Sequence, residues 1–122
     1  MTDMIVIAIV FIFFILIIYK KYNYFACSSM RSEAKFSLQQ IYSAQMLHFN
    51  EFGNFLSIEE LQEQNRISLS KIYYDFTITK EDNSYGFKAL AIGKNDTLVK
   101  GDTWQIDEKK SLVNSVNVCQ EK

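Results

Sequence analysis

Two cysteines and one histidine carry the side chains with the most distinctive chemistry in this 122-residue sequence. Cys27 and Cys119 lie far apart and show none of the short spacings that hold a metal ion. In an exported domain they can form a disulfide that ties the C-terminus to the base of the domain, and two free, unrelated thiols are the alternative. His48 falls on or beside the apolar face of a predicted helix, which favours a packed histidine over a metal ligand or a catalytic base.

Oxygen-bearing side chains gather near two predicted turns in the last third of the chain. Calcium takes such oxygen ligands, but the spacing of a calcium-binding EF-hand loop is absent, and turn chemistry accounts for the same residues. No nucleophile–base pair or metal set is recognisable, so we expect no catalysis, no metal and no cofactor. The residues in question are Asn95, Asp96, Asp102, Asp107 and Glu108.

Residues 4–19 contain no charge, no glycine and no proline. A helix that packs on one core shows an apolar stripe, whereas this segment is apolar on every face. It is slightly shorter than the roughly 20 residues of a spanning helix. Tyr19, Lys20 and Lys21 can extend it, because their stems lie along lipid while their polar ends reach the interface. We predict a membrane helix; a buried helix of a larger assembly is an alternative that is compatible with it.

The composition allows one domain in addition to this helix. The net charge is −1, which gives no basic field for nucleic acid. We assign residues 1–27 to the hydrophobic half of an N-terminal helix and residues 28–122 to a globular domain with one modest core.

Helical spacing continues through residues 28–53 with a narrow apolar face, and Gly53 provides its stop. If this helix joins the membrane segment, the two form a rod of about 70 Å at 1.5 Å per residue. Ser57 and Glu60 match a capping box that starts a short helix at 58–64.

The period then changes to two, which predicts strands within 71–118. Residues 71–79 place Ile72, Tyr74, Phe76 and Ile78 on one face, and residues 85–92 place Phe87, Ala89 and Ala91 inward. Further strands are expected at 103–107 and 112–118, with a short edge at 97–99 and a turn at 81–84. Strands this close in sequence pair as an antiparallel meander. We predict an α+β fold in which a sheet of about four strands packs on the amphipathic half of the long helix.

Four segments in this order resemble the type IV pilin and pseudopilin family. SEAKFSLQQIYSAQMLHF at residues 32–49 is similar to the family's helix segment, and EFGNF at 51–55 to its exit from that helix. YGFKALA at 85–91 and GDTWQIDE at 101–108 are similar to a strand pair common in pilin-like proteins.

The resemblance implies a structural subunit without catalysis. Its long helix is anchored in the inner membrane, its sheet domain lies outside the cytoplasm, and its helix later packs in a pilus or periplasmic pseudopilus. The expected partners are other copies or other pilins, the inner membrane and the assembly machinery, with no specific nucleic-acid site. Such filaments serve adhesion, motility, DNA uptake or secretion. The predicted assembly residues are Asp3, Leu38, Ile41, Ala44 and Gln45.

The sequence also departs from the family. The family's short basic leader is not seen before Met1, which leaves processing and N-methylation open. Asp3 stands where the family has an acid that neutralises the terminal amine of a neighbouring subunit; a solvated, idle Asp3 is the alternative. Ile12 and Lys20 replace a frequent Gly and Pro, so we expect a more continuous rod. Because Lys20 and Lys21 follow the span, the positive-inside rule alone would keep the domain in the cytoplasm. A single-span anchored binding domain that does not polymerise is therefore the alternative function.

Overall fold

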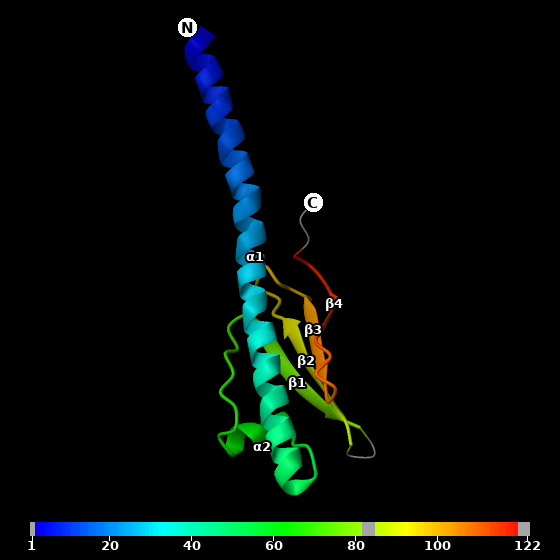
Figure 1. Cartoon of the computed structure of the whole chain (residues 1–122). Coiled ribbons are helices and arrows are strands. Elements are labelled where there is room, and N and C mark those ends of the chain that lie inside the picture. Colours follow the sequence, from blue (N-terminus) through cyan, green and yellow to red (C-terminus); the bar gives the residue numbers. More distant parts are fainter. Residues whose placement is uncertain (1, 82–84, 120–122) are drawn as a thin grey trace.

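The computed structural model describes residues 2–81 and 85–119, and a single long helix dominates it (Figure 1). Helix α1 runs over Thr2–Phe52, 51 residues. The chain has no proline, and Gly53 is its first glycine, so no residue before that point breaks the helix. Gly53 adopts φ 79°, a left-handed conformation that suits glycine after a helix, and its N–H donates to the Phe49 carbonyl. The continuous rod and its predicted stop are confirmed.

Four strands follow and form one antiparallel sheet in the order β1-β2-β3-β4. Their bounds are β1 Tyr74–Lys80, β2 Phe87–Gly93, β3 Thr103–Asp107 and β4 Val113–Val116. Each strand pairs with the next along the chain, with Phe76 opposite Ala91 and Ala91 opposite Trp104. The predicted meander is therefore confirmed.

The core lies between the C-terminal half of α1 and one face of the sheet, where α1 packs on β2 and β3 (Figure 1). Phe87, Ala89 and Ala91 are fully buried on that face, as the alternation in their strand predicted. The two alanines are small, which allows the helix to approach the sheet closely. Leu38 and Ile41 of α1, also fully buried, fill the space opposite.

A short helix, α2, covers the far end of the domain at Ile58–Glu63. Ser57 accepts a hydrogen bond from the Glu60 amide, and the Glu60 carboxylate accepts one from the Ser57 amide, which confirms the predicted capping box. The Ser57 amide, and secondarily its hydroxyl, hold the pKa of the Glu60 carboxyl below its usual value.

Three strand predictions were wrong in detail. Ile72 was expected inside, but it is exposed and precedes β1, which begins only at Tyr74. Residues 97–99 form turns rather than an edge strand, and of these only Val99 is buried. Strand β4 is shorter than 112–118. The turn predicted at 81–84 lies, apart from Glu81, outside the described residues.

Candidate functional site

The N-terminal part of α1 has no partner elsewhere in the described chain. Every residue from 2 to 22 is exposed, although large apolar side chains fill most of these positions. The helix is long and apolar enough to cross a membrane, and none of its most apolar 18-residue stretch is buried. Large apolar side chains on all faces of a helix favour lipid or neighbouring helices over water. Asp3 is exposed in the first turn of this helix.

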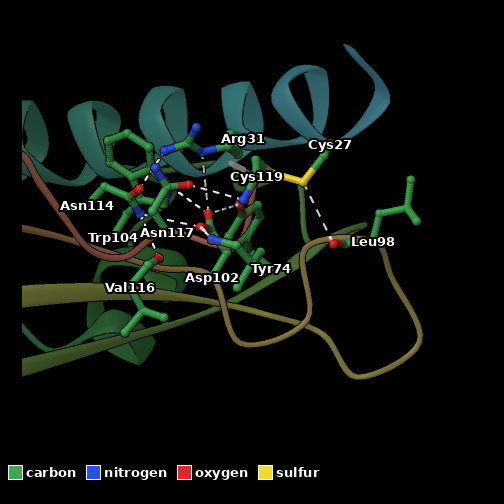
Figure 2. The surroundings of a disulfide bond; sticks show 11 residues. Cys27, Arg31, Tyr74, Leu98, Asp102, Trp104, Asn114, Val116, Asn117 and Cys119 are labelled. Atoms are coloured by element: carbon green, nitrogen blue, oxygen red, sulfur yellow. Dashed lines mark hydrogen bonds and ion pairs between the residues drawn. A yellow bond between two sulfur atoms is a disulfide. The ribbon is translucent and has the colours of Figure 1, made fainter. Parts of the chain in front are cut away.

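A disulfide lies close to where the exposed stretch meets the domain (Figure 2). Cys27 of α1 is joined to Cys119, with the two Cα atoms 5.7 Å apart and 92 positions between them in sequence. Both cysteines are buried. Of the two alternatives that the sequence left open, the structure has the pair. The cross-link holds the C-terminal segment against α1.

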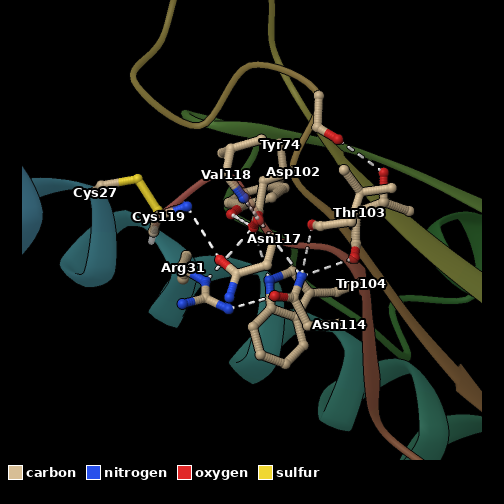
Figure 3. A network of polar contacts seen from close by, with 12 residues as sticks. Cys27, Arg31, Tyr74, Asp102, Thr103, Trp104, Asn114, Asn117, Val118 and Cys119 are labelled. Carbon is tan, nitrogen blue, oxygen red and sulfur yellow. Dashed lines mark hydrogen bonds and ion pairs between the residues drawn. A yellow bond between two sulfur atoms is a disulfide. The ribbon is translucent and has the colours of Figure 1, made fainter. Parts of the chain in front are cut away.

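Beside the disulfide, the buried carboxylate of Asp102 gathers donors from three parts of the chain (Figure 3). Its Oδ2 accepts hydrogen bonds from the Tyr74 hydroxyl at 2.6 Å and from Trp104 Nε1 at 2.8 Å. Its Oδ1 accepts the backbone N–H of Val118 at 3.1 Å. Arg31 Nε lies 3.6 Å from Oδ2, too far for a good hydrogen bond, so α1 contributes mainly opposite charge. Asp102 thus joins β1, β3, the C-terminal segment and α1.

The Tyr74 phenol is held in its protonated form by its surroundings. Removal of the phenol from water, and then its hydrogen bond to Asp102, raise the pKa of Tyr74 above its usual value. The phenol therefore remains a protonated donor at any ordinary pH, which suits it to a structural role.

A second carboxylate, Glu33 of α1, fixes the start of β1. Oε2 accepts the backbone N–H groups of Tyr73 at 2.7 Å and Tyr74 at 2.9 Å. Oε1 accepts the Ile72 N–H at 2.9 Å and the Ser70 hydroxyl at 2.6 Å. Because the Ile72 and Tyr73 amides bond to Glu33, β1 begins at Tyr74, later than the alternation of side chains predicted. In the sequence, Glu33 stands only within the segment that resembles the pilin family, and no local pattern marks its role at the start of β1.

Gln45 and His48 connect the far end of α1 to the loop that follows it. The Gln45 side chain donates to the Leu56 carbonyl at 2.6 Å and accepts the Leu56 N–H at 2.8 Å. His48 Nδ1 lies 2.9 Å from the Asn54 carbonyl oxygen, and its ring lies 4.7 Å from that of Phe52. The buried His48 is a packed histidine, as the sequence indicated.

The predicted assembly residues on the helix pack in the hydrophobic core of the subunit itself. Leu38, Ile41, Ala44 and Gln45 are all buried, so they cannot meet a second copy while the domain is folded. The apolar face of this half of α1 is narrow, and the sheet covers it. The placement of the assembly surface on that face is therefore corrected.

Three of the five oxygen-bearing residues near the turns, Asp102, Asp107 and Glu108, are committed to hydrogen bonds within the domain. Asp107 Oδ1 accepts the backbone N–H groups of Lys109 and Ser111, which closes a turn. Glu108 accepts the Phe87 N–H, while Asn95 and Asp96 lie exposed in the loop after β2. Within residues 2–81 and 85–119, no group of three or more His, Cys, Asp or Glu side chains could hold a metal ion.

Comparison with known proteins supports the fold. No protein-family model and no curated protein sequence matches the chain. Among solved structures, a type IV pilin from Shewanella oneidensis aligns with 79% of this chain and 99% of its own, with a TM-score of 0.54 and 24% sequence identity. The chain therefore has the fold of a type IV pilin, a long N-terminal helix on a four-stranded antiparallel sheet, and the predicted resemblance is confirmed at the level of the fold.

Proposed function

We propose that this protein is a structural subunit of a type IV pilus or a related pseudopilus. The observation that carries the proposal is the exposed, apolar N-terminal half of α1, rigidly continuous with the helix of the pilin fold. Before assembly this half lies in the inner membrane. During assembly it exchanges lipid for the helices of other copies, which bury the same side chains.

The surface that contacts other copies extends beyond the membrane segment. Phe14, Phe25, Phe36 and Leu47 are all exposed, and they follow one another at intervals of eleven residues. Eleven residues make close to three helical turns, so these side chains form one stripe along α1. We name them the outer stripe. It lies away from the residues that pack on the sheet, and it continues the apolar surface alongside the globular domain.

Asp3 completes the proposed assembly surface. It stands in the first turn of α1, at the far end from the domain, and an acid in lipid is stabilised by a positive partner. The terminal amine of a neighbouring copy would supply that charge.

The disulfide supports a location outside the cytoplasm. Disulfides persist in oxidising compartments and are rare in the cytosol. Lys20 and Lys21 favour the opposite orientation and, with it, a single-span anchored binding domain that does not polymerise. The two functions differ in the oxidation state of Cys27 and Cys119 inside cells, which alkylation with a membrane-permeant maleimide followed by mass analysis will show. We expect no alkylation before reduction.

Shearing of surface filaments from the native cells tests assembly directly. We expect the sheared fraction to contain this chain, identified by intact mass, which also reports trimming or methylation at the N-terminus. Phe36→Ser with Leu47→Ser should deplete the sheared fraction. Phe52→Ser is the matched control, because Phe52 is equally exposed but lies off the outer stripe. A chain held wholly in the membrane fraction, in a strain that makes filaments, would favour the anchored binding domain.

A further inference from the structure

We propose that the loop at residues 94–101 binds anionic phospholipid headgroups of the membrane that holds α1. This inference rests on the proposed function in one respect, that residues 4–19 lie in a bilayer. The binding surface consists of the exposed Leu98 and the lysines around it, Lys94, Lys100 and Lys71.

The loop has a fixed shape that presents Leu98 outward. The N–H of Thr97 donates to the Lys94 carbonyl, and the N–H of Lys100 to the Thr97 carbonyl, so two turns follow each other. A Cβ at Gly93 would lie 1.7 Å from the Val99 carbonyl oxygen, so only glycine permits this close return of the chain. Val99 is fully buried, whereas its neighbour Leu98 remains 51% exposed. Packing inside the domain therefore does not explain the leucine.

The loop lies beside α1 nearly two helical turns beyond the end of the membrane segment. The Leu98 carbonyl oxygen is 3.7 Å from Cys27 Sγ, a packing contact because a disulfide sulfur has no proton to donate. Figure 2 shows the Leu98 side chain on the N-terminal side of Cys27 along α1, toward the exposed stretch. Cys27 follows Lys21 by six residues, or about 9 Å of helix. The polar region of each leaflet is roughly 5–8 Å thick, so Leu98 reaches its outer edge.

Charge at this end of the domain fits a membrane surface. The Lys94 ammonium donates to the backbone carbonyl of Lys71, and the side chains of Lys71 and Lys100 are exposed. Lys20 and Lys21 face the same interface from α1. The acids nearby are Asp96 in the loop, Asp75, which lies 4.0 Å from Lys94, and Glu33, which accepts the Ser70 hydroxyl and the Ile72 amide on either side of Lys71. Together with Lys20 and Lys21, the five lysines outnumber these three carboxylates. Lysine stems lie along apolar surface while their ammonium groups reach phosphates, and the exposed Leu98 supplies an apolar contact from the same loop as Lys94 and Lys100.

Hydrogen–deuterium exchange of the full-length protein in nanodiscs tests this directly. The measured quantity is the exchange rate of the peptide covering 94–101 in phosphatidylcholine alone and in phosphatidylcholine with phosphatidylglycerol. We expect slower exchange in the anionic discs, and loss of the difference at high salt. Lys94→Gln with Lys100→Gln should weaken the headgroup contact by roughly fivefold per lysine removed. Leu98→Ser should also weaken it.

The matched control is Lys109→Gln with Lys110→Gln, the same charge change in the turn after β3. That turn lies at the opposite end of the sheet, where Lys110 is above the Tyr42 ring. The control should retain the full lipid effect. Equal exchange in both lipids, or an equal loss in the control, would overturn the proposal. So would variants at 94, 98 and 100 that reduce filament yield with the lipid effect intact, because the surface would then contact a second copy.

Failure of this proposal and failure of the proposed function give different results. Protein that does not insert into nanodiscs at all, and that sodium carbonate extracts from cell membranes, would contradict the membrane helix. Protein that inserts normally but shows the same exchange at 94–101 in both lipids would contradict only the headgroup contact.

Discussion

The two halves of α1 belong to one unbroken helix but relate to the rest of the chain in opposite ways. Residues 2–22 are exposed on every face, while the half that ends at Phe52 buries one face against β2 and β3. Leu38 is fully buried, whereas Phe13, an equally apolar residue, is 64% exposed. The difference shows that the domain covers only the narrow apolar face of the second half, and that none of the described residues outside α1 covers the apolar surface of the first half.

We expect the largest effect on stability at the junction between the two halves of α1, where the disulfide lies. Cys27→Ser with Cys119→Ser removes a cross-link that closes a loop of 92 positions in sequence, which we expect to lower the free energy of unfolding of the sheet domain by about 4 kcal/mol. Urea unfolding in mild detergent, monitored by the fluorescence of Trp104, measures this change in the free energy of unfolding. Membrane extraction by carbonate should not change, since the exposed half makes no use of the bond. A simultaneous loss of membrane retention would mean that the two halves are energetically coupled.

Leu38→Ala tests how much the packing of α1 on the sheet stabilises the domain. The substitution leaves a cavity between α1 and the sheet, and we expect a loss of about 3 kcal/mol in the same urea experiment. Phe36→Ala is the matched control on the same helix, because Phe36 is 71% exposed and should cost less than about 0.5 kcal/mol. Similar losses from both variants would show that the outer stripe is covered within the subunit itself.

Ile12→Arg examines the exposed half. A charge near the centre of a membrane helix costs about 2.5 kcal/mol on the insertion scale, so a larger fraction of the variant should become extractable by carbonate. The unfolding of the sheet domain should stay as in the wild type. Phe36→Arg introduces the same charge beside the globular domain and should leave extraction unchanged. If both arginines had the same effect on extraction, the exposed half would not be distinguished by lipid.

The periodicity of the sequence predicted the fold because local patterns determine most of it. The change from helical to alternating period located the strands, β3 with the bounds that the structure shows, and Gly53 and the capping box at Ser57 located two helix boundaries. The start of β1 was misplaced because its amides bond to Glu33, which is about 40 residues away in sequence. A hydrogen bond between residues so far apart in sequence cannot be predicted from the local alternation of apolar and polar side chains.

The candidate site was harder to predict for a related reason. A helical period shows that one face is apolar, but it does not show whether the chain's own sheet or a second copy covers that face. Leu38 and Ile41 were assigned to assembly, although the predicted packing of the sheet on this half of the helix already accounts for their apolar face, and the sheet buries them. The outer stripe was not predicted, because single exposed apolar residues are common on protein surfaces. Only the structure shows which apolar residues of α1 are exposed and which are buried in the core.

A substitution at Gln45 is expected to have the smallest effect, and it tests whether this residue serves its own domain or contacts a second copy. Gln45→Leu keeps the volume of the side chain but leaves the buried N–H and C=O of Leu56 without their partner, which should cost about 2 kcal/mol in urea unfolding. Gln40→Leu is the matched control, since Gln40 accepts one hydrogen bond, from the Ser68 amide near the surface, and should cost less than about 0.5 kcal/mol. At a temperature where Gln45→Leu is still folded, its sheared filament yield should equal that of the wild type, because the residue serves its own domain. A reduced yield from a fully folded variant would return Gln45 to the assembly surface and would contradict the division of α1 into a packed half and an exposed half.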